Sequence, residues 1–326
     1  MKKIHNDIQD LISGATSILI SSHLDSDGDS LGSQLAMARY IDSLGKKSII
    51  INHGAISDKY MFLPDIERVL PIEKCESDKN FDLAVILECP HTGRTGDVRH
   101  LIDADTRIIN IDHHPDNSGY GDIIHVDPKA SAVAEMLVEF FFDVDFEIDQ
   151  EAATQLYTAI LTDTGRFRFN STTRRTMEIA GRLIELGADP RYISDSVYYS
   201  FTEATMRLIG RVFSNVDFFD NGNICLISLD NKTLTENKCN SADTEGMAEY
   251  TLFGKSVKVG GLLREVGERK TKVSLRSRNR INVGTVAHKY GGGGHDNASG
   301  FHVDLPLAEA HQQVLADLKE IIDGSV

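Results

Sequence analysis

The 326-residue sequence predicts an α/β protein with two domains, a parallel sheet with helices on both faces and a smaller C-terminal α/β domain, separated by a cleft. Three observations support this fold class. Apolar strand runs alternate with amphipathic helical patterns over the first part of the chain, as they do in parallel α/β sheets. From Val212 onward the pattern changes to short strands. The chain is also longer than the ~250–300 residues at which a single core stops growing.

The first domain is placed at residues 1–186. Its predicted strands are buried apolar runs of four to eight residues, and its predicted helices carry apolar residues at helical spacing. The strands are expected at Ser17–Ser22, 47–52, 82–88 and 107–114, and the helices at Leu31–Gly45, Ala130–Phe142, Gln150–Leu161 and Thr173–Leu186. Repeated strand–helix order predicts that the strands are parallel.

Residues 187–210 are predicted to form a helical linker, and residues 211–326 form the second domain. A further helical pattern covers roughly Ser194–Val212. The dipeptide Asn221-Gly222 between two apolar runs predicts a β-hairpin. Two more strands are expected in VKVGGLLREV and TKVSLRSR.

The net charge of -15 is distributed unevenly. Residues 1–210 carry 20 Lys and Arg against 34 Asp and Glu, whereas the remainder carries 14 against 15. Within the remainder, residues 255–280 hold nine basic residues and two acidic ones. An acidic chain with one basic strip fits a short anionic ligand better than a long duplex, whose phosphates the rest of the surface would repel.

The chain shows no apolar run long enough to span a membrane and no signal-peptide pattern, so we expect a cytoplasmic protein. Its four cysteines are scattered and form no CxxC pair. They are therefore interpreted as reduced structural thiols rather than as a disulfide framework or a zinc knuckle.

Histidine and acidic residues follow several of the predicted strands. His23, Asp27 and Asp29 come after the first strand, Glu88 ends the third, and Asp112-His113-His114 ends the fourth, while Asp163 ends a helix. In an open parallel sheet, ligands gather at the carboxyl ends of the strands. Imidazole and carboxylate ligands suit manganese, magnesium or zinc. For the first segment alone the alternative is a loop whose Asp and Ser residues cap a helix, but the repeated clusters favour two metals that share a carboxylate.

A glycine run, Gly291–Gly294, precedes His295 near the C-terminus. Backbone amides of such a run can wrap an anion, although glycine runs are often only flexible loops. In the preceding basic strand, Arg276 and Arg278 are expected on one face, with Val273 and Leu275 on the other. The alternative for these arginines is that they only solubilise an exposed strand.

The order HxxxDxD, strand-end acid, DHH, TDTGxF and GGGGHxxASG resembles the DHH phosphoesterase superfamily with its DHH-associated C-terminal domain. The resemblance covers nearly the whole chain and is greatest to the nanoRNase and pAp-phosphatase branch. It implies a DHH catalytic domain that binds two divalent metals, manganese above all, with magnesium or cobalt as alternatives. The implied ligands are His23 and Asp27 for the first metal, Asp29, His113 and Asp163 for the second, and Glu88 as the bridge.

The resemblance also implies how the substrate is held. His114 would face the scissile phosphate, and Asp112 would support the site. His295 would be the third catalytic residue. The substrate-binding set of the C-terminal domain would be Arg276, Ser277, Arg278, Gly292, Gly293, Gly294 and His295. The implied substrates are short RNA or DNA oligonucleotides or small nucleotides, with no membrane partner, and a homodimer is left open.

Two positions depart from the family pattern. The bridging residue is normally aspartate, so Glu88 either still bridges the metals or weakens one site. Asp25 has no counterpart and is expected to face solvent or to support a ligand. Two other enzymes remain alternatives, an inorganic pyrophosphatase and a phosphodiesterase of cyclic or linear dinucleotides. The altered bridging position adds a third alternative, a nucleotide-binding regulator whose catalysis is weakened.

Overall fold

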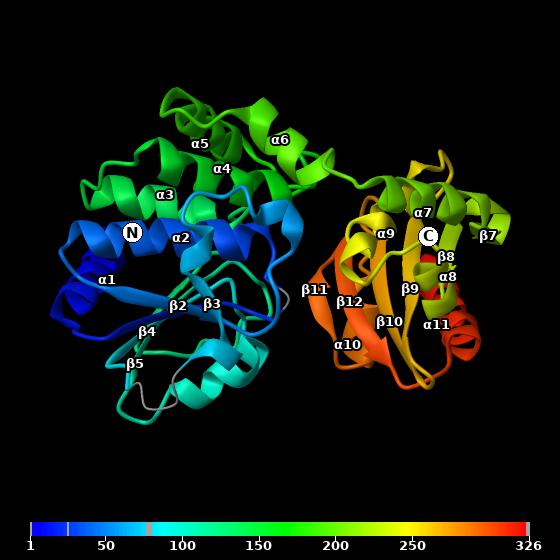
Figure 1. Ribbon diagram of the computed structural model, residues 1–326, viewed down its shortest axis with the longest axis horizontal. Coiled ribbons are helices and arrows are strands. Elements are labelled where there is room, and N and C mark those ends of the chain that lie inside the picture. Colours follow the sequence, from blue (N-terminus) through cyan, green and yellow to red (C-terminus); the bar gives the residue numbers. More distant parts are fainter. Residues whose placement is uncertain (1, 25, 76–79, 324–326) are drawn as a thin grey trace. The chain divides into compact units, whose positions relative to one another are not determined.

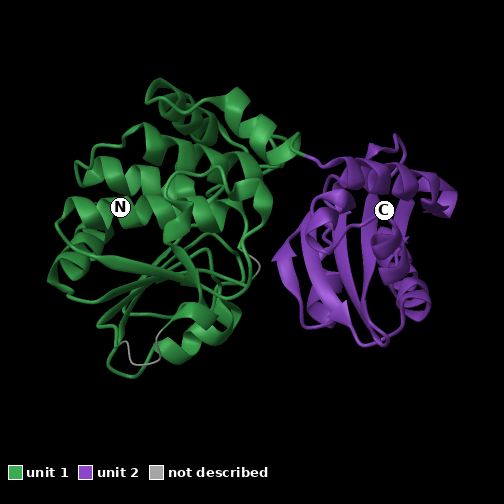
Figure 2. Cartoon of the chain, viewed as in Figure 1, with its two compact units in different colours: residues 1–200 green, residues 201–326 purple. Residues whose placement is uncertain are grey.

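The computed structural model describes residues 2–24, 26–75 and 80–323. The chain divides into two compact units, Met1–Ser200 and Phe201–Val326 (Figure 2). The stretch predicted as a separate linker is thus shared between the units: α6 (Pro190–Tyr198) belongs to the first and α7 (Glu203–Ser214) to the second. The single helix expected over 194–212 is two helices, because the side chain of Thr202 accepts a hydrogen bond from the amide of Thr205 and starts a new helix there.

The first unit contains a six-stranded sheet with the order β3-β2-β1-β4-β5-β6 (Figure 1). Every neighbouring pair is parallel, as the sequence predicted. The strands are β1 (Ile18–Ser21), β2 (Ser48–Asn52), β3 (Val69–Pro71), β4 (Leu83–Leu87), β5 (Arg107–Asp112) and β6 (Ile123–Val126). All residues of β1 and β4 are buried, which is why these central strands are continuous apolar runs rather than alternating ones.

Both faces of this sheet are covered, but in different ways. One face is covered by helices that share one large core cluster with the sheet (Figure 1). They are α1 (Lys2–Gly14), α2 (Gly28–Ser43), α3 (Val133–Asp143), α4 (Gln150–Asp163) and α5 (Arg174–Glu185), of which α5 packs on α3 and α4. The other cluster includes Leu19, Ala84 and Ile86 of the sheet together with Val98. Val98 lies in a 3₁₀ segment, η4 (Thr92–Leu101), so this face is covered by short 3₁₀ turns and loops where the sequence predicted helices.

Four shorter 3₁₀ and helical pieces complete the first unit's connections. They are η1 (Asp58–Tyr60), η2 (Ile66–Arg68) and η3 (Ile72–Lys74) between β2 and β4, and α6 after α5. Local capping explains where several helices start. Asp149 caps α4, and Thr173 forms a reciprocal capping box with Thr176 at the start of α5.

The second unit contains a mixed six-stranded sheet with the order β11-β12-β10-β9-β8-β7. Its strands are β7 (Asp217–Phe219), β8 (Ile224–Leu229), β9 (Val259–Gly267), β10 (Lys270–Ser277), β11 (Gly293–His295) and β12 (Ala298–Val303). The predicted hairpin at Asn221-Gly222 is confirmed, because β7 and β8 pair antiparallel across it. Between β8 and β9 the pairing is parallel.

Helices cover both faces of this second sheet. On one face, α10 (Gly284–Lys289) and α11 (Leu307–Asp323) contribute to the cluster that contains Val273 and Leu275. On the other face lie α7, α8 (Asn231–Glu236) and α9 (Met247–Tyr250). The remaining 3₁₀ turns are η5 (Asp220–Gly222), η6 (Ala242–Thr244) and η7 (Thr251–Phe253). Among the helices that the structure describes, none has the length and apolarity needed to cross a bilayer.

Candidate metal centre

The candidate site lies where the strand order of the first sheet reverses. In space β1 is flanked by β2 on one side and β4 on the other, so the connections leave in opposite directions. In open parallel sheets, ligands bind at the carboxyl ends of the strands at such a point. The strands β1, β4 and β5 are adjacent in the sheet. His23 lies just after the end of β1, Glu88 follows β4, and His113 follows β5. This topology explains how residues that are far apart in the sequence come together.

Two groups of potential ligand atoms form at this edge. In the first, Glu88, His113 and His114 have ligand atoms within 4.8 Å of one another, and the second contains His23, Asp27 and Glu88 at the same separation. Nε2 of His113 lies 3.3 Å from Oε2 of Glu88 and 3.4 Å from Oδ2 of Asp163. Ligand atoms that bind one ion at ~2.0–2.2 Å lie ~3–4.3 Å apart, so these spacings fit divalent metal coordination.

Glu88 belongs to both groups, as a bridging ligand would. Its carboxylate is 2% exposed, and its backbone has a left-handed φ of 53°. Such a conformation costs a non-glycine residue ~1–3 kcal/mol and is typical of functional sites. Burial opposes a charge on Glu88, but the imidazoles of His114 and His113 hold its pKa below the usual range. The glutamate side chain, which is longer than the aspartate usual at this position, still reaches both groups of ligand atoms.

His113 is oriented by the protein backbone. Its Nδ1 donates to the carbonyl of Ala130 over 3.0 Å, which turns Nε2 toward the two carboxylates. A hydrogen bond of this kind commonly fixes the tautomer of a metal-binding histidine. Burial opposes the charged ring, but Glu88 and Asp163 raise the pKa of His113 well above its ordinary value. Burial, with Glu88 adding in the same direction, raises the pKa of Asp163 to about 7.

His114 is held by a different partner. Its Nδ1 donates to Oδ1 of Asp112 over 2.8 Å, and Oδ2 of Asp112 accepts from Nδ2 of Asn117 over 2.6 Å. Asp112 is fully buried and also accepts from the backbone amide of His113. Burial disfavours the imidazolium, yet Glu88 and Asp112 raise the pKa of His114 to about 9. Asn117 was missed in the sequence, where no local pattern connects it with Asp112.

His23 and Asp27 show that the capping and metal interpretations of their loop are compatible. Oδ1 of Asp27 accepts from the amide of Ser30 and caps α2, as the alternative interpretation predicted. Its Oδ2 lies 3.9 Å from Nε2 of His23. That nitrogen is also 3.0 Å from the hydroxyl of Ser30, a second residue that the sequence analysis did not single out. Asp25 lies outside the described residues.

Asp29 is fully buried and serves the fold as well as the site. Its Oδ2 accepts from the amide of Val133 over 2.6 Å, while Oδ1 accepts from the amide of Ala134 and from the hydroxyl of Ser33. The carboxylate thus anchors the first turn of α3. A carboxylate has about four lone-pair positions, so about one is left for a metal. Burial, then Glu88 and Asp163, raise the pKa of Asp29 well above its usual range.

The chemistry of the donor set fits a divalent cation. Three buried or half-buried carboxylates, those of Asp29, Glu88 and Asp163, repel one another here. The imidazoles of His113 and His114 oppose this repulsion, because they lower the pKa values of Glu88 and Asp163. A divalent cation would relieve it, and oxygen and imidazole ligands suit manganese, magnesium or zinc.

The candidate substrate residues of the second unit are only partly on its surface. Along β10 exposure alternates as predicted: Val273 and Leu275 are buried, and Arg276 is half-buried on the opposite face. Arg278 is exposed, and its guanidinium donates to the carbonyl of Leu252. Ser277 falls on the buried face, where its hydroxyl donates to the carbonyl of Ile281 over 2.6 Å. Its contact with a substrate is therefore not supported by this arrangement.

The glycine run is more ordered than the sequence suggested. The amides of Gly291 and Gly292 donate to the carbonyls of His288 and Ala287, at the end of α10. Gly293, Gly294 and His295 form β11, which pairs with β12. A side chain at Gly292 would collide with the backbone of Gly300. Close packing, and not only access for an anion, thus requires glycine at this position.

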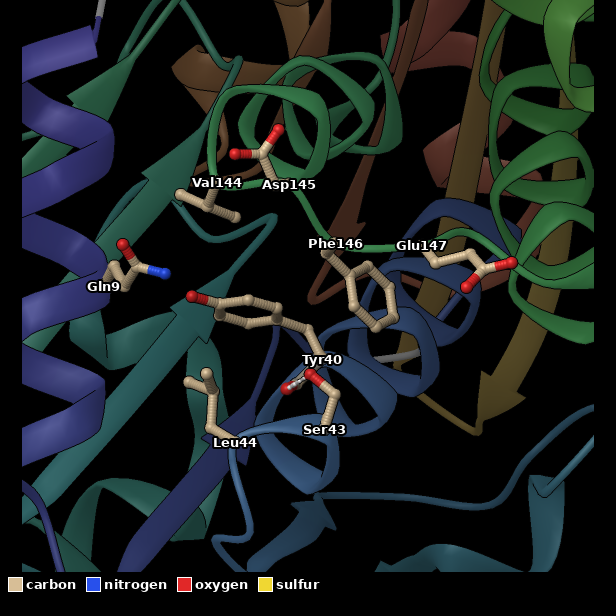
Figure 3. A pocket seen from close by; sticks show the side chains of 8 residues that line it. All are labelled: Gln9, Tyr40, Ser43, Leu44, Val144, Asp145, Phe146 and Glu147. Atoms are coloured by element: carbon tan, nitrogen blue, oxygen red, sulfur yellow. Dashed lines mark hydrogen bonds between the residues drawn. The ribbon is translucent and has the colours of Figure 1, made fainter.

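A hollow of about 310 Å³ lies elsewhere on the first unit and contains none of the candidate ligands (Figure 3). Its lining comes from α1, α2 and the segment between α3 and α4. Tyr40 and Phe146 form its apolar part, and Gln9, Asp145 and Glu147 its polar part. None of its lining residues is a histidine, so the hollow does not resemble the ligand cluster at the strand ends.

The ligand cluster at the switch point of the first sheet has the donor set of a metal-dependent hydrolase of phosphate esters. Residues 17–160 match the DHH family, N-terminal domain, and residues 222–324 match the DHHA1 domain. The chain belongs to the DHH family of phosphoesterases. The expected fold class and family resemblance are thereby confirmed.

Individual relatives cover both units of the chain. A Thermus thermophilus protein named bifunctional oligoribonuclease and PAP phosphatase NrnA is 33% identical over 93% of this chain and 89% of its own length. A Streptococcus mutans protein with the same name, qualified as probable, is 31% identical over 94% of each chain. Among solved structures, an exopolyphosphatase-related protein from Bacteroides fragilis has a TM-score of 0.91 and 28% identity, covering 98% of this chain and 96% of its own.

Proposed function

We propose that this protein hydrolyses short oligoribonucleotides, 3′-phosphoadenosine 5′-phosphate (pAp), or both, with two divalent metals at the strand-end cluster. The observation that carries the proposal is that Glu88 is common to two groups of ligand atoms at the switch point. The names of the Thermus and Streptococcus relatives supply the substrate class. Two ions there would activate a water and neutralise the charge that develops on phosphorus.

We assign the ligands by group. His23 and Asp27 would hold the first ion, and His113, Asp163 and the remaining lone pair of Asp29 the second, with Glu88 between them. Manganese is the metal we favour, because the set mixes imidazole with several carboxylates and contains no thiolate. Magnesium and cobalt remain alternatives that the same ligands accept.

His114 is proposed as the residue that contacts the scissile phosphate. Because Nδ1 is used by Asp112, a contact with the phosphate would be made through Nε2. Although burial opposes the charge, Glu88 and Asp112 raise the pKa of His114, which favours the charged ring. A charged imidazole can donate a hydrogen bond to the phosphate or a proton to the leaving oxygen. Asp112 is a positioning residue in this scheme.

The second unit is proposed to hold the non-reacting part of the substrate. Arg276 and Arg278 carry charges that suit a phosphate, and His295 ends β11, the edge strand of the second sheet. The glycines Gly293 and Gly294 would allow a close approach of the ligand to the backbone. Ser277 and Gly292 act in this proposal by supporting the fold of the same region.

A substrate panel tests the proposal. Purified protein with manganese would be offered pAp, RNAs of two to five residues, pyrophosphate and cyclic di-AMP, with Asp163→Ala as the matched control. We expect manganese-dependent release of phosphate from pAp or of mononucleotide from short RNA, and neither from the control. Hydrolysis of pyrophosphate or of cyclic di-AMP alone would contradict it in favour of that rival enzyme. Tight nucleotide binding without turnover would instead indicate a regulator weakened by Glu88.

The cellular setting is proposed on similar grounds. Cys89 and Cys225 are buried thiols that form no disulfide. Unpaired buried thiols are typical of a reducing compartment, which favours the cytoplasm. A homodimer is a further proposal that sedimentation would test directly.

A further inference from the structure

A second histidine pair occurs in the first unit and shares no residue with the candidate metal centre. His5 lies on α1 and is fully buried, and His125 lies on β6 and is half-buried. Nδ1 of His5 donates to Oδ2 of Asp143, at the end of α3, over 2.8 Å. His5 is 120 residues from His125 and 138 from Asp143 in the sequence, so only the fold brings them together.

The two imidazoles have the spacing of ligands on one tetrahedral ion. Their Nε2 atoms lie 3.4 Å apart, and the ring centres lie 5.2 Å apart with 70° between the planes. Two imidazoles bound through Nε2 to one tetrahedral ion at ~2.0–2.1 Å would have these nitrogens about 3.4 Å and the ring centres about 5.2 Å apart. A direct hydrogen bond from a ring N–H typically spans about 2.7–3.2 Å, so the observed separation is long for one.

The partners of both rings suit metal binding. Because Asp143 accepts from Nδ1 of His5, the Nε2 of that ring presents a lone pair when the ring is neutral. A carboxylate behind a histidine is the usual support of a histidine ligand. Burial, and then the neighbouring His5, lower the pKa of His125 to about 4, so that ring is uncharged at neutral pH.

The surroundings of the pair restrict which ion would bind. Phe140 packs edge-on against the ring of His5 and keeps it in place. Two imidazoles without a directly opposed carboxylate favour zinc, copper or nickel over manganese or magnesium, which prefer oxygen ligands. His125 is half-exposed, so water can complete the coordination. This preference is opposite to that of the carboxylate-rich cluster at the strand ends.

We propose that His5 and His125 form an auxiliary site for a borderline divalent cation such as Zn²⁺, with Asp143 as the supporting carboxylate. An ion there would link α1 to β6 across the edge of the first unit. Because it would bind the folded state and not the unfolded one, it would also stabilise the unit.

Zinc titration of tag-free protein tests the proposal. Equilibrium dialysis with metal analysis would compare the wild type with His125→Gln and with His100→Gln, a control at an exposed histidine of η4. We expect His125→Gln to bind one equivalent of zinc less than the wild type, and His100→Gln to match the wild type. The thermal midpoint of the wild type should rise with zinc by more than that of His125→Gln.

His5→Gln is a second test, but because His5 is buried the variant has to show a wild-type circular dichroism spectrum before it is used. Turnover with manganese should be the same for His125→Gln and the wild type, since the pair is not part of the proposed catalytic cluster. Equal zinc stoichiometry and an equal thermal shift in the wild type and His125→Gln would overturn the proposal and leave the pair as a long hydrogen bond.

Discussion

The contact between Asp112 and His114 makes a sharp prediction for Asp112→Asn. The substitution keeps the size of the side chain but removes the charge that accepts from Nδ1 of His114. In the metal-loaded enzyme, bound ions would neutralise much of the charge on Glu88, which leaves Asp112 as the main carboxylate that keeps His114 charged. The variant should therefore bind metal and substrate normally but turn over slowly.

The expected magnitude follows from the hydrogen bonds that are lost or opposed. A hydrogen bond to a charged group contributes about 1.5–3 kcal/mol, so kcat should fall roughly 10- to 150-fold if that bond matters in the transition state. An amide in place of Oδ2 would also face the amide of Asn117, which now donates to it over 2.6 Å. This conflict should lower the free energy of unfolding by about 1–3 kcal/mol.

Steady-state kinetics on pAp and a dinucleotide over a range of pH would measure the effect. The charged form of His114 exists below its folded pKa, which Asp112 raises through its hydrogen bond to Nδ1. Removing Asp112 lowers that pKa, so the loss of activity at high pH should begin at a lower pH in the variant. Asp116→Asn, on the exposed part of the same loop, is the matched control and should behave as the wild type. A wild-type kcat with an unshifted pH profile in Asp112→Asn would refute the positioning role.

The remaining predictions separate binding, chemistry and folding. Asp163→Ala should lose metal and activity with little change in stability, and full turnover by this variant would reject the ligand assignment. Asp29→Ala should lose metal and also about 1–3 kcal/mol in the free energy of unfolding, because the amides that start α3 lose their acceptor. Urea unfolding distinguishes this variant from Asp163→Ala, and equal stability of the two would contradict the role of Asp29 as an anchor of α3. Arg276→Ala should chiefly raise KM and His295→Ala should also lower kcat, with unchanged metal content; wild-type kinetics in both would leave these side chains as solubilising groups. Activity should fall as RNA lengthens beyond a few nucleotides, since the acidic surface repels a longer chain, and equal rates on RNAs of two and twenty residues would argue against this.

Much of the site could be predicted from the sequence because its residues follow strand ends. The carboxyl ends of parallel strands meet at one edge of a sheet, so the order of Glu88, His113 and the earlier His23 already implied proximity. The alternation of Val273, Leu275 and Arg276 likewise needs only the period of a strand. The hairpin at Asn221-Gly222 needs only local turn chemistry. These features depend only on residue types and their spacing within short segments of the chain.

Other features arise from contacts that no local pattern encodes. Asp29 anchors α3 through amides more than a hundred residues away, and Asn117 supports Asp112 from the next loop. Ser277, which was expected to bind substrate, is buried and donates to the carbonyl of Ile281. Each of these roles depends on which backbone group or side chain the fold brings within hydrogen-bond distance.

The sequence by itself thus determined the class of sheet, and it predicted the position of the candidate site and the residue types in it, since these follow from periodicity and residue type. Only the tertiary structure decided how the ligands are held. It placed Glu88 in a left-handed conformation between two ligand groups and brought His5 against His125. It also covered one face of the sheet with 3₁₀ turns. The physical reason is that buried polar groups must find partners, and in a packed fold those partners come from remote segments.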